Sequence, residues 1–214
     1  MRPQRTKAQV ADSRRFILDT ARRLYARRRV EEVSMDDIAR TAGYTRRTLY
    51  AYFTSADEIR LLILLDDLKT RWALQQTRMA HAETGLAKII AWGQALFEFS
   101  QENPHATQLQ AFWDYRGIDR RLIGRRVFRQ FEKINNELAE GLRTIFALGL
   151  RDGSVRPDIS IDLCISQFLY SLRGIIHRAL LTGYSLATFD PDEYVNHFFE
   201  LFSEAIGNPK GQTV

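Results

Sequence analysis

The polar side chains of residues 45–52 are of the kinds that bind phosphates and base edges. This segment, TRRTLYAY, holds two arginines, two threonines and two tyrosines. An arginine guanidinium can pair through two N–H groups with guanine O6 and N7 or with a phosphate. Threonine and tyrosine hydroxyls are common donors to phosphate oxygens. On a helix, Leu49 and Phe53 would face inward because they are four residues apart. The outward set would then contain no carboxylate: Arg46, Arg47, Tyr50, Ala51 and Thr54.

Two short helices and a tight turn must position these side chains. Ser34 is expected to cap a helix over residues 35–42. Gly43 allows the left-handed backbone that ends this helix. Thr45 is expected to cap the next helix, which runs to about Phe53. Such spacing predicts a helix-turn-helix, in which the second helix lies in the major groove of DNA.

The rest of the chain also has helical patterning. Glycine and proline are sparse, and no stretch alternates apolar and polar residues as a strand would. The other helices are expected over residues 13–28, 55–79, 84–101, 104–116, 119–149, 158–182 and 191–206. The predicted fold class is therefore all-α with about nine helices. A three-helix head over residues 1–56 is joined to a larger helical body over residues 57–214.

Positive charge is concentrated in the head. The chain has a net charge of +5, and residues 1–53 carry 13 Lys and Arg against 6 Asp and Glu. The remainder carries 18 against 20. Because Lys and Arg gain free energy by releasing counterions from phosphates, this asymmetry favours a polyanion-binding head. A solvated basic face is the alternative.

Several classes of protein lack support in the sequence. No apolar run approaches the roughly 20 residues of a membrane span, and no secretory signal opens the chain. The single cysteine, Cys164, cannot form an internal disulfide, which fits a cytoplasmic protein. Phosphate-loop, HExxH and paired-cysteine motifs are missing, and the four histidines are scattered. We therefore expect no enzyme activity, no cofactor, no metal site and no membrane partner.

Residues 34–59, SMDDIARTAGYTRRTLYAYFTSADEI, resemble the DNA-binding region of the TetR family of bacterial transcription regulators. The resemblance is carried by DIA, the AG turn, TLY and the aromatic residue before the next helix. It implies a homodimer, a palindromic operator in double-stranded DNA and a small-molecule effector held in the body. Residues 57–214 would then form the ligand-binding and dimerisation domain, and repression would be the commoner mode of action.

The family pattern also suggests which residues of the head contact DNA. Ser34, Thr45, Thr48, Tyr50 and Tyr52 would hold phosphates. Arg46, Arg47 and Ala51 would lie nearest to base edges. Members of the family commonly have a small residue where Arg47 stands. An additional contact is therefore expected from Arg47, either to a base or to a phosphate.

The last two helices have apolar residues on more than one side, which indicates a second packing partner. Leu163, Tyr170, Gly174 and Leu181 lie outside the main stripe of the helix over residues 158–182. The resemblance implies that these two helices pair with their mates in a homodimer. The alternative is that both lie in the centre of a monomer core.

Large aromatic side chains are frequent in the body. By resemblance, some should line a cavity for an apolar or aromatic effector, although ordinary core packing is the alternative for each one. The candidates are Trp72, Trp92, Phe112, Trp113, Phe128, Phe131, Phe168 and His177. The identity and charge of the effector stay open.

Two functions remain beside a ligand-responsive regulator. A non-specific or architectural DNA-binding protein would bind any duplex with a steep salt dependence. A helical carrier of apolar ligands would bind no duplex even at low salt, and its basic head would be incidental.

Overall fold

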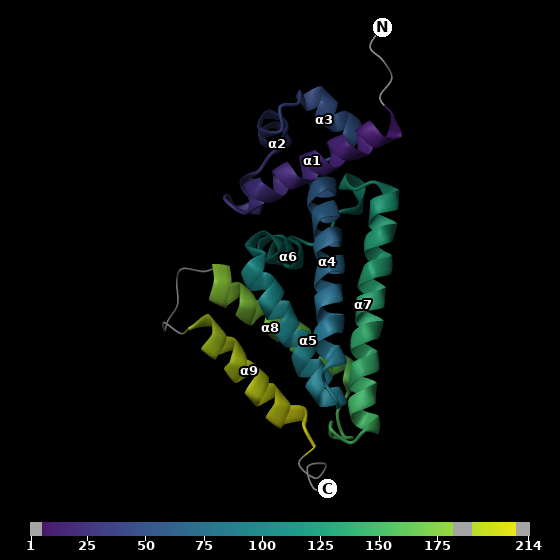
Figure 1. Ribbon diagram of the computed structural model, residues 1–214, viewed down its shortest axis with the longest axis vertical. Coiled ribbons are helices and arrows are strands. Elements are labelled where there is room, and N and C mark those ends of the chain that lie inside the picture. Colours follow the sequence, from purple (N-terminus) through teal and green to yellow (C-terminus); the bar gives the residue numbers. More distant parts are fainter. Residues whose placement is uncertain (1–5, 182–189, 209–214) are drawn as a thin grey trace. The chain divides into compact units, whose positions relative to one another are not determined.

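The computed structural model describes residues 6–181 and 190–208, and within these ranges the chain is built of α-helices without an extended strand (Figure 1). The predicted all-α fold is confirmed. By its internal contacts the chain divides into two compact units. The described part of the first unit is Thr6–Asp67 with Gln108–Glu132, and that of the second is Leu68–Thr107 with Lys133–Leu181 and Asp190–Asn208.

The first unit is built around the predicted helix-turn-helix. It contains α1 (Lys7–Tyr25), a 3-10 turn (Val30–Glu32), α2 (Met35–Thr41), α3 (Arg46–Tyr52) and the beginning of α4 (Ala56–Ala80). It also contains the end of α6 (Pro104–Arg116), a second 3-10 turn (Arg120–Leu122) and the beginning of α7 (Arg125–Arg151). In Figure 1, α2 and α3 lie together against α1. Ile17, Ile38, Leu49 and Ile59, from four different helices, meet in one apolar core.

The first helix lies several residues upstream of its predicted range of 13–28. It begins at Lys7 because Thr6 and Gln9 form a capping box, in which each side chain accepts a hydrogen bond from the other residue's backbone N–H. It ends at Tyr25, and Arg28 lies beyond it, where its guanidinium donates to the Glu32 carbonyl at 2.9 Å. The polar side chains at both ends of α1 therefore determine where the helix begins and ends, which the apolar stripe alone does not reveal.

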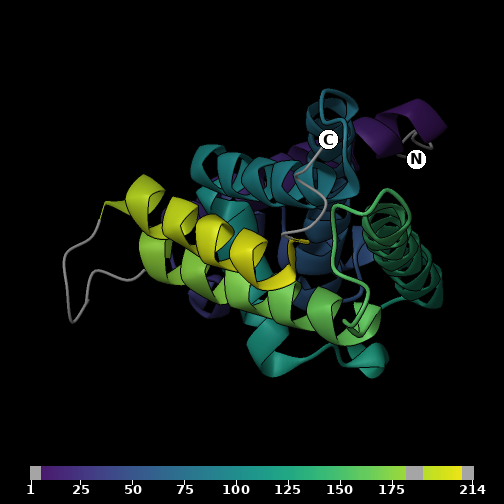
Figure 2. The same cartoon turned by 90° about the horizontal axis from the view of Figure 1, so that it is seen from below.

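The second unit contains the remaining parts of α4, α6 and α7, together with α5 (Gly85–Glu102), α8 (Ile161–Leu181) and α9 (Pro191–Ile206). Figures 1 and 2 show α8 and α9 side by side, running in opposite directions. Helix α5 packs against both of them. The core of this unit gathers apolar side chains from α4, α5, α7, α8 and α9.

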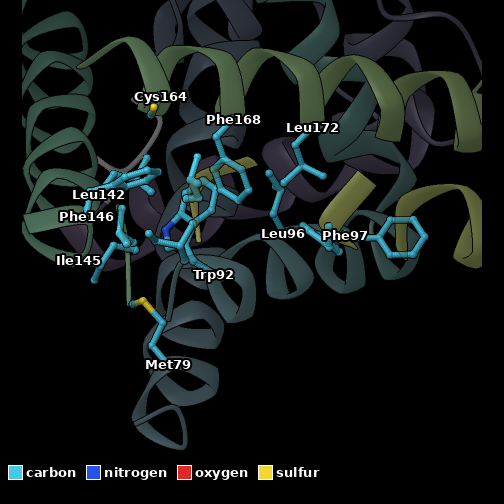
Figure 3. Packing of buried hydrophobic residues seen from close by; sticks show 14 of the residues in the cluster. Met79, Trp92, Leu96, Phe97, Leu142, Ile145, Phe146, Cys164, Phe168 and Leu172 are labelled. Carbon is cyan, nitrogen blue, oxygen red and sulfur yellow. The ribbon is translucent and has the colours of Figure 1, made fainter. Parts of the chain in front are cut away.

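Figure 3 shows the aromatic centre of that core. The Trp92 and Phe168 rings lie with centroids 5.9 Å apart, and Phe146 meets the edge of Phe168 at 6.4 Å. Cys164 is buried in the same cluster, and burial raises the pKa of its thiol. The cysteine therefore serves as a core residue rather than as a reactive thiol.

The helix predicted over residues 119–149 begins six residues late. Asp119 accepts a hydrogen bond from the Arg121 N–H at 2.9 Å and caps a 3-10 turn, after which Ile123 is extended. Helix α7 then starts at Arg125. A local side-chain cap thus competes with the continuous helix that the apolar spacing indicates.

Candidate nucleic-acid interface

The turn between α2 and α3 has the predicted geometry. Gly43 has a φ of +72°, the left-handed conformation that favours glycine. On either side of the turn, Ile38, Ala39 and Leu49 are buried. The small Ala39 side chain allows the two helices to approach closely. Sequence spacing therefore predicted the inner face of this motif correctly.

The start of α2 is fixed by a capping box between Ser34 and Asp37. The Ser34 Oγ accepts from the Asp37 N–H at 3.1 Å, and Asp37 Oδ2 accepts from the Ser34 N–H at 3.0 Å. The Ser34 hydroxyl also donates to Asp37 Oδ2 at 2.7 Å. These bonds from Ser34 lower the pKa of Asp37 to about 2. In this arrangement the hydroxyl hydrogen of Ser34 is used by Asp37 rather than offered to a phosphate.

The start of α3 leaves one hydroxyl hydrogen available. Thr45 Oγ1 accepts from the Thr48 N–H at 3.1 Å, which confirms Thr45 as the cap. The two threonine hydroxyl oxygens are 2.8 Å apart, so one of them donates to the other. The second hydroxyl keeps its hydrogen, which can be donated to a phosphate oxygen.

Arg46 is held between two groups on the exposed surface of the motif. Its Nη1 lies 3.1 Å from Asp36 Oδ2, and its Cζ lies 5.6 Å from the centroid of the Tyr50 ring. The Tyr50 hydroxyl, and after it the Asp36 carboxylate, raise the pKa of Arg46 above its ordinary value. The outward side of α3 has no carboxylate of its own, but the preceding helix supplies one.

Arg47 and Ala51 are exposed on α3, and Tyr50 keeps 44% of its surface accessible. Within the described part of the chain, no hydrogen bond or ion pair engages the Arg47 side chain. Tyr52 is half-buried and meets the edge of the Tyr44 ring, with centroids 6.3 Å apart. The structure therefore brings the base-facing candidates together on one open surface, on which Arg47 is exposed.

Arg14 of α1 holds the end of α3, a role that the sequence did not reveal. Its guanidinium donates to the Tyr52 carbonyl and lies over the Phe53 ring, 4.3 Å from the centroid. The last carbonyls of a helix have no partner within the helix itself. Arg14 supplies one of these partners and fixes the orientation of α3 on α1.

The candidate effector residues do not form one group. Trp72, Trp92, Phe168 and His177 belong to the second unit, and Phe112, Trp113, Phe128 and Phe131 belong to the first. Trp92 and Phe168 are core residues, and Trp72 packs on Gly141 at the edge of that core. Phe112 lies near the Arg60 and Arg116 guanidinium groups, at 5.1 and 5.3 Å from its centroid.

Two of the polar atoms buried in the second unit belong to neighbouring side chains and have no hydrogen-bond partner among the described residues. They are Gln75 Oε1 and Trp92 Nε1. Gln75 is fully buried, and its Nε2 donates to the Trp92 carbonyl at 3.3 Å, so the two residues are neighbours. An acceptor and a donor are thus left unpaired where burial makes an unpaired polar group unfavourable.

The outer surfaces of α8 and α9 expose large apolar side chains. Leu163, Tyr170 and Leu201 are 65%, 66% and 53% accessible. Gly174 of α8 is also exposed, whereas the side chain of Leu181 falls outside the described residues. Across the described ranges, no helix has the length and apolar character to cross a membrane, and no cluster of metal-ligand side chains occurs.

Comparison with known proteins identifies the family. The sequence model of one protein family, described as bacterial regulatory proteins of the tetR family, matches residues 17–62. The chain is 30% identical over 158 residues to the HTH-type transcriptional repressor KstR2 of Mycolicibacterium smegmatis, covering 74% of this chain and 75% of that protein. This chain belongs to the TetR family.

Solved structures of TetR-like fold agree over nearly the whole chain. The ketosteroid transcriptional regulator KstR2 of Mycobacterium tuberculosis has a TM-score of 0.64 at 16% identity, over 95% of this chain and 97% of that one. FadR of Bacillus subtilis, in complex with stearoyl-CoA, has a TM-score of 0.71 at 14% identity, over 89% and 98%. These likenesses support the fold. The resemblance found at residues 34–59 is confirmed, and this TetR-family member is a DNA-binding transcription regulator.

Proposed function

We propose that this TetR-family regulator is a dimeric repressor that reads a palindromic operator through α3. It leaves the operator when a small, mostly apolar effector binds to the second unit. The observation that carries the proposal is the two-sided character of α3. Leu49 is buried in the head, while Arg46, Arg47 and Ala51 share the open side. This side offers the donors that base edges and phosphates accept.

The DNA contacts divide by chemistry. Arg47 is exposed, and no described residue accepts a hydrogen bond from it, so its five N–H donors are available to a guanine or to a phosphate. Thr45 and Thr48 together offer one hydroxyl hydrogen, and Tyr50 offers its own hydroxyl. Ser34 can reach a phosphate only by releasing Asp37. We therefore assign it the weakest contact of the set.

The homodimer would be formed through α8 and α9. Leu163, Tyr170 and Leu201 give these helices an exposed apolar surface. Burial of such apolar surface contributes about 25 cal/mol of free energy per Å² and is the main driving force for association. Two heads in a dimer would occupy successive major grooves about 34 Å apart, which accounts for a palindromic operator.

Repression is favoured because KstR2, the relative at 30% identity, is named as a repressor. We propose that the DNA-binding domain spans residues 1–56 and that the effector-binding and dimerisation domain spans residues 57–214. This boundary follows the end of the helix-turn-helix. Because the chromosome is the target, we place the action of the protein in the bacterial cytoplasm.

The effector would be largely apolar with an uncharged polar group. The core of the second unit is apolar and aromatic, and its neighbouring Gln75 and Trp92 have an unpaired acceptor and an unpaired donor. A hydroxyl group could donate to Gln75 Oε1 and accept from Trp92 Nε1, whereas a carbonyl group could accept from Trp92 Nε1 alone. FadR of Bacillus subtilis, which is similar in structure, is in complex with stearoyl-CoA, a ligand with a large apolar part, and KstR2 is called a ketosteroid transcriptional regulator. Trp72, Phe168 and His177 are the further candidates from the same unit.

Selection of bound duplexes from a random pool tests the proposal. The wild-type protein, at near-physiological salt, should enrich a palindromic sequence and bind it as two chains per duplex. A variant with both Arg46→Ala and Arg47→Ala should lose that enrichment while remaining folded. Failure of the wild type to enrich any sequence would favour non-specific DNA binding. Failure to bind any duplex at low salt would favour a carrier of apolar ligands.

A further inference from the structure

A carboxylate stands on the DNA-facing surface of the motif, beside an arginine that is expected to meet base edges. Asp36 lies in the first turn of α2 and Arg46 begins α3, and their Oδ2 and Nη1 atoms are 3.1 Å apart. The two side chains keep 55% and 64% of their surface accessible. An ion pair this exposed contributes little to folding stability. Its consequences should therefore appear mainly in DNA binding.

Asp36 restricts the directions in which Arg46 can extend. The guanidinium is held by the carboxylate on one side and by the Tyr50 ring on the other. Only one of its five N–H groups is needed for the bond to Asp36. The remaining N–H groups can still form the two parallel bonds that guanine O6 and N7 accept. A side chain held in this way loses less conformational entropy on binding than a free one.

Asp36 also makes contact with phosphates unfavourable. A carboxylate offers only acceptors and repels the phosphate backbone, whereas cytosine N4 can donate to it in the major groove. A charge that penalises wrong contacts increases discrimination while it lowers overall affinity. Arg47, one residue further along α3, has no carboxylate partner among the residues that the structure describes. The two adjacent arginines thus stand in different electrostatic surroundings.

We propose that Asp36 is a specificity-determining residue: it directs Arg46 toward a base edge and away from the phosphates. The inference rests on the proposed function, since it requires an operator. In this account Arg46 reads one base pair in each half-site, and it does so only while Asp36 holds it. Without Asp36, Arg46 becomes a general phosphate contact.

The test compares the sequences selected by the wild type, Asp36→Ala, Asp36→Glu and Arg46→Ala. We expect Asp36→Ala and Arg46→Ala to relax the preference at the same base-pair position of each half-site. For Asp36→Ala, the ratio of operator to scrambled-duplex affinity should fall about a hundredfold, the cost of about one mismatched pair in each of the two half-sites. Its affinity for scrambled duplex should rise, and the slope of log K against log salt should steepen by about 1.8, as for one more phosphate contact from each head of the dimer.

Matched variants keep the result interpretable. Glu83→Gln makes the same change of net charge in the exposed segment before α5, and it should leave both affinities unchanged. Asp36→Glu keeps the carboxylate and should retain most of the base preference. Circular dichroism and the thermal midpoint establish that each variant is folded.

The outcomes separate this inference from the proposed function. A wild type that enriches no sequence overturns the proposed function, and this inference falls with it. A wild type with a consensus that Asp36→Ala retains in full overturns the role of Asp36 alone. Loss of preference at different positions in Asp36→Ala and Arg46→Ala also overturns it, because the two residues then act separately.

Discussion

Asp57 and Arg60 form a buried ion pair one turn apart on α4, with Nη1 2.6 Å from Oδ1. Their side chains are only 6% and 8% accessible. The same guanidinium donates to the carbonyls of Val30 and Val33 at 3.0 and 2.9 Å. It therefore ties α4 to the 3-10 turn that leads into α2, and so helps to position the helix-turn-helix.

Arg60→Met should destabilise the protein strongly. Asp57 would keep only the half-exposed Arg116 as a partner, and two carbonyls would lose their donors. Breaking a buried pair by removing one member costs about 3–5 kcal/mol. The denaturant midpoint of the unfolding transition measures the loss. Arg121→Met is the control, because Arg121 pairs with Asp119 on the surface, and it should leave the midpoint nearly unchanged.

The Asp37 capping box should make stability depend on pH in the acid range. The pKa of Asp37 is lowered from 3.8 to about 2, so the folded state favours the ionised carboxyl. The stabilisation is therefore complete above about pH 3.8 and is lost as the pH falls toward about 2. Urea midpoints of the wild type and Asp37→Asn should differ most at pH 6, differ less at pH 3 and converge toward pH 2. A difference that stays constant over this range would show that the charge of Asp37 plays no part.

Gln75→Met should stabilise the protein. The substitution removes a buried carbonyl oxygen without a partner and keeps a side chain of similar length and helix propensity. We expect the free energy of unfolding to rise by about 1 kcal/mol, since an unpaired buried acceptor costs about 1–3 kcal/mol and the lost bond to Trp92 is long.

Gln76→Met, at the exposed neighbouring position, is the control and should change little. If Gln75→Met instead lowers the thermal midpoint clearly, the amide is paired in solution, for example with an ordered water. In that case it is not reserved for an effector.

Charged substitutions on α8 and α9 should dissociate the dimer. Leu163→Glu and Leu201→Glu each place a carboxylate where the proposed interface would bury an apolar side chain. Sedimentation should give twice the mass of one chain for the wild type and the mass of one chain for each variant. Leu122→Glu, an exposed leucine in the first unit, should remain dimeric. A wild type that sediments as one chain would exclude the proposed assembly.

Local signals in the sequence predicted much of the head. Ser34 and Thr45 cap their helices, Gly43 makes the turn and Leu49 lies inside, all as expected. Each of these features depends on residues within a few positions of one another. The family resemblance then identified the function, because the same short segment carries the family's motif.

Contacts between distant residues escaped prediction. Asp36 and Arg46 are ten residues apart, and Arg14 and Tyr52 are 38 apart, so only the packing of the helices brings them together. Spacing alone does not distinguish core aromatics from ligand contacts, because both occupy apolar positions of helices. Phe112, a candidate for the pocket, lies beside the Arg60 guanidinium in the first unit, and its contact with an effector stays a prediction.

The central claim, that the exposed side of α3 meets DNA, is tested most directly by titrating Arg47→Ala with the selected duplex and with a scrambled duplex. Fluorescence anisotropy gives both affinities. The account predicts that both affinities fall. If Arg47 reads one base in each half-site, the ratio of operator to scrambled-duplex affinity should fall about a hundredfold, whereas an equal fall would assign Arg47 to a phosphate. Arg151→Ala, at the end of α7, should change neither. If Arg47→Ala binds both duplexes as tightly as the wild type, α3 does not meet DNA as proposed.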